Sequence, residues 1–85
     1  MPVISRFHGI VVFMNYNDHP PPHLHARHEG AEALVLLGSR RVRGELPPRP
    51  LRMLLHWVDL HYDELLVNWR RAREHEYLLP IEPLP

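Results

Sequence analysis

The sequence contains no cysteine and no lysine, and its ten acidic residues balance its ten arginines. Without cysteine, disulfides, thiolate nucleophiles, cysteine-based zinc fingers and cysteine-ligated iron–sulfur clusters are excluded. Without lysine, Schiff-base catalysis and phosphate binding by a Walker-type lysine are excluded as well. Because the formal net charge is zero, the chain as a whole has no excess charge with which to hold nucleic acid or an anionic membrane non-specifically.

Long apolar runs are also missing. The longest run near the N-terminus, residues 9–14, has six residues, whereas a membrane-spanning helix needs about 20. The same run is too short for a secretory signal peptide. We therefore expect a cytoplasmic protein with no membrane partner, in which residues 1–85 form a single small domain.

The first half of the chain has the pattern of short β-strands separated by turns. Isoleucine, valine and aromatic residues are concentrated in residues 7–16. Three consecutive prolines follow, and they cannot lie in a central strand because they lack an N–H donor. Turns that contain glycine separate three further predicted strands, at His23–His28, Ala31–Leu37 and Arg40–Leu46. This pattern predicts an antiparallel meander of three to four strands.

The second half has helical periodicity. Apolar residues recur at helical spacing from Leu51 to Ala72 and form one wide stripe that can cover a face of the sheet. A second, narrower stripe on the opposite side consists of Met53, Leu60 and Val67. Two interpretations are open: the helix breaks near His61 into two shorter helices, or a partner covers the second stripe. The two halves together predict an α+β fold with one long helix or two shorter helices packed on one face of the sheet.

Several apolar residues in this half are candidates for contact with another chain. Trp57 lies off the main stripe. Residues 77–85 form an extended, proline-punctuated tail that either packs back on the domain or lies along a second chain. The partner is expected to be another small protein or a second copy of this chain. The candidate partner-binding residues are Met53, Trp57, Leu60, Val67 and Ile81.

Half of the eight histidines lie within ten residues, from His19 to His28. Because side chains alternate along a strand, His23 and His25 point to the same face and can chelate one metal ion. His19 is held nearby by the prolines, and Asp18 is either a third or fourth ligand or an outer acceptor that fixes a histidine tautomer. These four residues are the candidate metal-binding set, whereas His28 has the wrong parity. Such ligands with an open position suit Zn(II), Cu(II), Ni(II) or Fe(II).

The same residues allow interpretations without a metal. Histidines beside prolines often bond backbone carbonyls or contact a partner, and imidazoles can act as acid and base on RNA. A separate basic cluster, Arg40, Arg41 and Arg43, is either a solvated face or a small phosphate-binding surface. Because no aromatic residues are interleaved with these arginines, nucleic-acid binding has little support.

An ordered set of short motifs resembles a known family. The set begins with residues 2–10 and continues with Asp18-His19-x-Pro21-Pro22-His23-x-His25. It ends with Gly44-x-Leu46-Pro47, Trp57 with Leu60-His61, Glu64-Leu65, Asn68-Trp69 and Ile81-Glu82-Pro83-Leu84. Taken together these motifs resemble the small bacterial domain-of-unknown-function 4160 family over nearly the whole chain. An aromatic residue is more usual in that family at the position of His28, so the resemblance favours His19, His23 and His25.

The resemblance implies a protein that works as one half of a two-gene unit. The neighbouring gene often encodes a small protein of the domain-of-unknown-function 2442 family, and such a pair is toxin–antitoxin-like. We therefore expect a small binding module that acts in a protein complex or in a two-gene regulatory pair. The alternative is a histidine-dependent protein, either a nuclease-like toxin or a metal-binding protein, that uses His19, His23 and His25.

Overall fold

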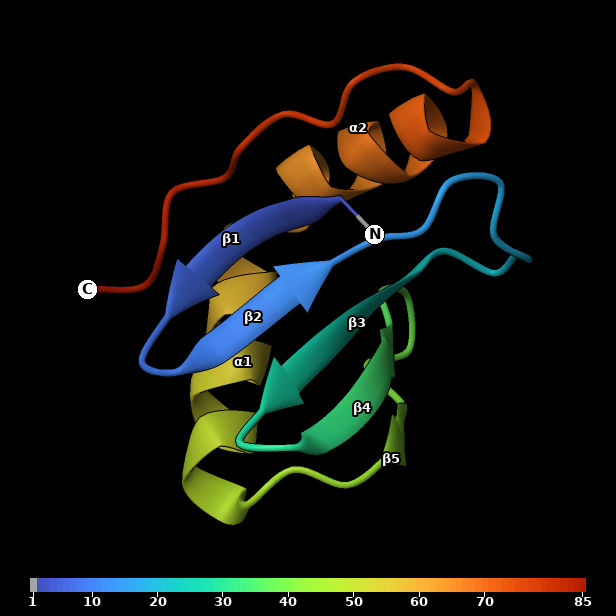
Figure 1. The fold of residues 1–85 in the computed structure, drawn as a ribbon. Coiled ribbons are helices and arrows are strands. Elements are labelled where there is room, and N and C mark those ends of the chain that lie inside the picture. The colour runs from blue at the N-terminus through green and yellow to red at the C-terminus, as the bar shows by residue number, and fades with distance from the viewer. Residues whose placement is uncertain (1) are drawn as a thin grey trace.

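The computed structural model describes residues 2–85, which form an antiparallel sheet followed by two helices (Figure 1). The five strands are hydrogen-bonded in chain order, β1-β2-β3-β4-β5. The expected α+β class is confirmed, with five strands in place of the expected three or four. The elements are β1 (Val3–Phe7), β2 (Ile10–Phe13), β3 (His23–His28), β4 (Ala31–Leu36), β5 (Val42–Gly44), α1 (Pro48–Leu60) and α2 (Tyr62–Arg73).

The additional strand is β1, and a tight turn creates it. His8 and Gly9 both have positive φ angles, 49° and 78°, and join β1 to β2. Glu29 and Gly30 join β3 to β4 in the same way, with φ angles of 47° and 85°. A two-residue hairpin turn in which both residues have positive φ has a backbone twist that matches the right-handed twist of the flanking strands. The expectation of a single strand from Phe7 to Tyr16 was therefore wrong, because this turn lies within its first residues.

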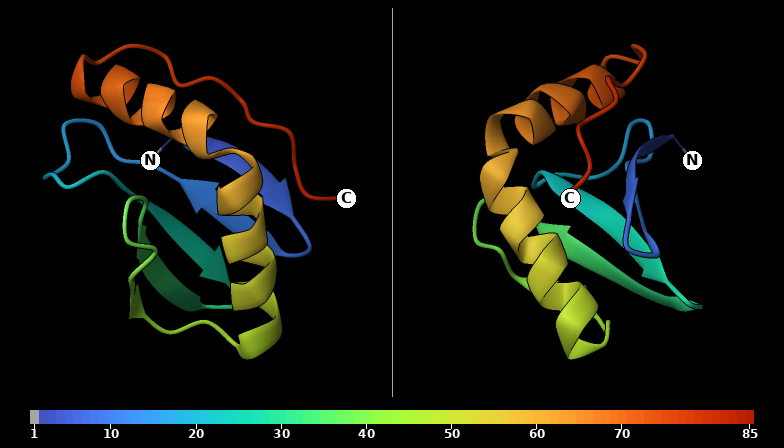
Figure 2. Two further views of the ribbon diagram at one scale, coloured as in Figure 1. Left: turned by 180° about the vertical axis from the view of Figure 1, so that it is seen from behind. Right: turned by 90° about the vertical axis from the view of Figure 1, so that its left-hand side faces the viewer.

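One face of the sheet is apolar and packs against the helices (Figure 2). Its buried residues include Val12, Leu24, Ala26, Ala33 and Val35. From α1, Leu54, Trp57 and Val58 are buried in the same core cluster. The intervening residues of β3 and β4 point to the other face of the sheet, because strand side chains alternate. That other face carries the histidines discussed below.

The helical region breaks at His61, which separates α1 from α2. His61 has φ −119° and ψ 24°, outside the helical range, and its backbone N–H donates to the Trp57 carbonyl. After the break α2 takes a new direction across the end of the sheet (Figures 1 and 2). Of the two interpretations of the second apolar stripe, the break is the one that the structure supports. Met53 and Val67 are half-buried, and only Leu60 of that stripe is exposed.

The tail packs back on the domain. Ile81 is buried, and its N–H donates to the Ile4 carbonyl of β1 at 2.9 Å. The indole N–H of Trp57 donates to the Glu82 carbonyl at 2.9 Å. Trp57 and Ile81, both expected as partner contacts, are therefore core residues of their own chain.

Within residues 2–85, no helix is long and apolar enough to cross a membrane.

Candidate metal centre

The candidate site lies where the β2–β3 loop enters β3. Contacts with α2 hold this loop: the Asn17 N–H donates to the Ala72 carbonyl at 3.2 Å, and the Arg73 guanidinium donates to the Asp18 carbonyl at 2.6 Å. Because α2 turns at His61, its last turn reaches the loop (Figure 1). The break in the helical region therefore positions the backbone of the candidate site.

Three side chains converge at this position. Oδ2 of Asp18 lies 2.9 Å from Nε2 of His23 and 3.2 Å from Nε2 of His25. Potential ligand atoms of the three residues all lie within 4.8 Å of one another. We call Asp18, His23 and His25 the tripod. The expectation that strand alternation brings His23 and His25 together agrees with this geometry, since both belong to β3.

The hydrogen bonds of His23 fix the orientation of its ring. Its Nδ1 lies 2.8 Å from the Pro21 carbonyl oxygen and its Nε2 lies 2.9 Å from the Asp18 carboxylate. Both partners offer oxygen atoms, so the two contacts hold the imidazole ring in one orientation. A metal ion at Nε2 would take the place of the contact with Asp18 and leave the contact of Nδ1 with Pro21 intact. Such a bond to a backbone carbonyl is what orients a metal-binding histidine.

His25 is held by contacts on both sides of its ring. It stacks on Phe13 with ring centroids 5.0 Å apart and an interplanar angle of 12°. Its Nδ1 lies 3.9 Å from Glu32 Oε2, on the side of the ring away from Asp18. Glu32 is fixed in turn by Arg27, whose Nε donates to Oε1 at 2.6 Å. At 3.9 Å Glu32 is too far from Nδ1 for a hydrogen bond, but it places a carboxylate near the outer nitrogen of His25, where metal-bound histidines usually have a hydrogen-bonded partner.

The tripod keeps its carboxylate ionised. Burial alone raises the pKa of the Asp18 carboxyl. Hydrogen bonds from His25, from the His19 backbone N–H and from His23 oppose this effect, and together with the charge on His23 they lower the pKa of Asp18 to about 2. An ionised carboxylate is the form that binds a cation, so Asp18 is ready to act as a ligand at neutral pH.

The tripod opens into a pocket of about 240 Å³. Besides the three ligand candidates, the pocket is lined by His19, Pro20, Pro21, Leu34, Leu36 and Arg43. Two imidazole nitrogens and one carboxylate oxygen on one side of an ion leave its other coordination positions free for water or a ligand. Such a site can hold Zn(II) or another transition-metal ion and present a substrate to it.

The structure places the other expected site residues differently. The side chain of His19 is outside the tripod, and this residue contributes its backbone N–H, which donates to Asp18 Oδ1 at 2.8 Å. His28 lies at the opposite end of β3. In the basic cluster, Nε of Arg40 donates to Asp59 at 2.9 Å and Arg41 is exposed. Only Arg43 of that cluster lines the pocket.

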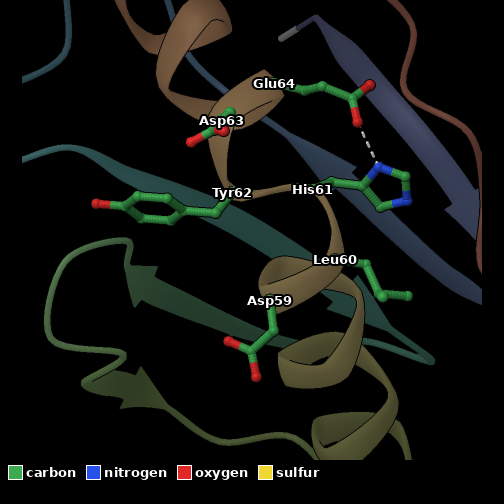
Figure 3. Close-up of a pocket in the computed structure, with 6 residues that line it drawn as sticks. All are labelled: Asp59, Leu60, His61, Tyr62, Asp63 and Glu64. Atoms are coloured by element: carbon green, nitrogen blue, oxygen red, sulfur yellow. Dashed lines mark hydrogen bonds and ion pairs between the residues drawn. The ribbon is translucent and has the colours of Figure 1, made fainter.

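A second hollow surrounds the helix break but does not gather metal ligands (Figure 3). Its side chains diverge: His61 Nδ1 bonds Glu64 Oε1 at 2.6 Å, while Asp59 and Asp63 point elsewhere. Asp59 already pairs with Arg40. Across residues 2–85, the tripod is the only group of three acidic or histidine side chains close enough to share an ion.

Comparison with known proteins identifies the family of this chain. The model of a family described as a domain of unknown function (DUF4160) matches residues 9–70, a segment that includes the tripod and Arg43. No curated protein and no solved structure matches the chain.

Proposed function

This chain belongs to the DUF4160 family, and we propose that it is a metal-binding protein that holds one transition-metal ion at Asp18, His23 and His25. The observation that carries the proposal is the convergence of the three donor atoms, at 2.9 and 3.2 Å, on the wall of a pocket. The orientation of His23 by the Pro21 carbonyl supports it, because a metal requires one free ring nitrogen in a fixed direction.

Zn(II), Cu(II), Ni(II) and Fe(II) all accept two imidazoles and a carboxylate. A bound ion with open positions would polarise a water molecule or a substrate oxygen. The residues of this chain would orient the ion and exclude water from part of its surroundings, because Leu34, Leu36 and the prolines line the pocket. A nuclease-like activity is one use of such a site.

The proposal is tested by titrating protein purified without a histidine tag with Zn(II) and with Co(II), using calorimetry and visible absorption. We expect one ion per chain, with micromolar or tighter affinity. His25→Gln removes one imidazole ligand, and we expect it to weaken binding by about 100-fold or more, since loss of an outer-shell partner alone costs roughly 10- to 100-fold. Asp18→Asn, which is isosteric, is a second variant for the same measurement.

His56→Gln is the matched control, because His56 is an exposed histidine on α1 away from the tripod. It should bind the ion as tightly as the unchanged chain. Circular dichroism establishes that each variant is folded. If the unchanged chain binds neither ion, or if His25→Gln and Asp18→Asn bind as tightly as the control, the proposal is wrong.

We propose a second candidate function, binding to a small protein encoded nearby, on the basis of an apolar groove. The groove, of about 210 Å³, lies between α2 and the tail and is lined by Glu64, Val67, Leu79, Pro80 and Ile81. Its only charged residue is acidic, so the segment that fits it is apolar with a basic flank. Leu79 is 48% exposed there, which makes it the accessible apolar contact.

Size-exclusion chromatography with light scattering, with and without the neighbouring gene product, tests this second function. We expect a complex that Leu79→Asp abolishes, because a carboxylate would be buried in the apolar groove. Leu60→Asp is the control, since Leu60 is 57% exposed but lies outside the groove. The proposal fails if no complex forms, or if Leu79→Asp has no more effect than Leu60→Asp.

A further inference from the structure

Arg43 is a charged residue of the pocket that the metal proposal does not use. It lies on β5, opposite Leu34 of β4, and Leu34 lies opposite His25 of β3. Residues that are directly opposite across neighbouring strands point to the same face of a sheet. Arg43, Leu34 and His25 therefore form one row across the face that carries the tripod, and all three line the same pocket.

Within residues 2–85, the guanidinium of Arg43 has no acidic partner, since the arginines that form ion pairs there are Arg27, Arg40 and Arg71. Asp18, the only acidic residue of the pocket, is hydrogen-bonded to His23 and His25. A divalent ion on the tripod would therefore leave the pocket with a net positive charge.

We propose that the pocket binds a small oxyanion, a phosphate or carboxylate group, with one oxygen directed at the metal ion and Arg43 as its counter-charge. This inference rests on the proposed metal function. An arginine guanidinium suits the role, because its planar donors match the two oxygens of a carboxylate or phosphate. The metal ion and Arg43 would hold the anion from two sides, with Leu34 between them in the row.

The size of the pocket limits what can enter. Its volume is about 240 Å³, below the roughly 300 to 1,000 Å³ of pockets that enclose a whole drug-sized ligand. The pocket therefore accommodates the anionic group and the atoms next to it. The rest of a larger ligand would extend past the exposed His19 into solvent.

The experiment uses the full chain loaded with Co(II), whose visible absorption responds to a change in its ligands. Inorganic phosphate is titrated in one series and acetate in another, at constant ionic strength. We expect a saturable spectral change, and the tighter of the two series identifies the class of oxyanion. Arg43→Gln is expected to raise the dissociation constant of that anion about tenfold or more, as for loss of a charge-assisted hydrogen bond.

Arg41→Gln is the matched control. Arg41 is an exposed arginine two residues away that does not line the pocket, and its replacement removes the same charge. We expect it to change the dissociation constant by less than about twofold. Both variants should bind Co(II) as the unchanged chain does.

The possible failures are distinguishable. If the unchanged chain binds no Co(II), the metal function is wrong, and the oxyanion inference is overturned with it. If Co(II) binds but neither anion changes the spectrum, or if Arg43→Gln and Arg41→Gln respond alike, the oxyanion inference is wrong while the metal function stands.

Discussion

Trp57→Ala is expected to lower the free energy of unfolding by about 3 to 5 kcal/mol, the usual range for truncating a buried tryptophan. Trp57 is fully buried and contacts Phe7 of β1, with ring centroids 5.2 Å apart. Its indole N–H also donates to the Glu82 carbonyl, which the tail brings over α1. This one side chain therefore joins the helix, the sheet and the tail, and its loss leaves a cavity and an unpaired carbonyl.

Because small domains are marginally stable, Trp57→Ala is expected to leave much of the chain unfolded, so a milder variant is needed. Trp57→Phe keeps most of the ring and removes the bond to Glu82, and we expect it to cost about 2 kcal/mol. Urea unfolding followed by Trp69 fluorescence measures both variants, and Leu60→Ala on the exposed side of α1 is the control. If neither variant differs from that control, Trp57 does not support the core.

Gly44→Ala is expected to destabilise the fold by about 3 kcal/mol or more, because it combines an unfavourable backbone conformation with a steric clash. Gly44 ends β5 with a φ angle of +86°, which is strained for any residue with a Cβ atom. A Cβ atom at this position would also lie 2.5 Å from the Glu32 carbonyl oxygen of β4 and 3.2 Å from the Ala33 Cα. The backbone of β4 or β5 has to move to relieve this contact, and Arg43 would move with it.

Alanine substitutions at two other glycines separate the energetic cost of the backbone conformation from the cost of the steric clash. Gly30 has a similar φ of +85° with open space where a Cβ atom would lie, so Gly30→Ala measures the conformational strain, about 1 to 2 kcal/mol. Gly38 has open space and no positive φ, and Gly38→Ala should be close to neutral. Denaturant unfolding of the three variants gives the ranking. Equal losses for Gly44→Ala and Gly30→Ala would show that the close approach to Glu32 has no energetic effect.

The local features of the fold could be predicted from sequence because each depends on a few neighbouring residues. The strand His23–His28 and the Glu29-Gly30 turn follow from alternation and from glycine. The His8-Gly9 turn was missed because the apolar residues on both sides of it resemble a single strand. The helix break could not be decided, because the apolar stripe continues through His61 and the break is defined by backbone angles there.

In the candidate site, too, the residues that could be predicted are those whose positions depend on nearby residues in the sequence. The placement of His23 and His25 on one face is a local property of a strand, and Asp18 is close to both in sequence. Glu32, which lies 3.9 Å from His25, and Arg43, which lines the pocket, were not predicted as parts of the site because strand register places them there. Glu32 lies diagonally across from His25, whose direct partner is Leu34, and Arg43 lies one strand further. Trp57 was likewise predicted to contact a partner, because the tail that packs over it is distant in sequence.

The placement of the tail has a consequence for how copies of this chain can associate. Its Ile81 N–H occupies the Ile4 carbonyl at the outer edge of β1. At the opposite edge, β5 has only three residues and ends at the positive φ of Gly44. The two edges of the sheet are therefore partly protected against edge-to-edge pairing, the contact through which β-sheet proteins commonly aggregate: β1 by the tail at Ile4, and β5 by its short length. A dimer that joins two copies through a continuous intermolecular sheet would have to displace the tail from Ile4 or pair along the three residues of β5.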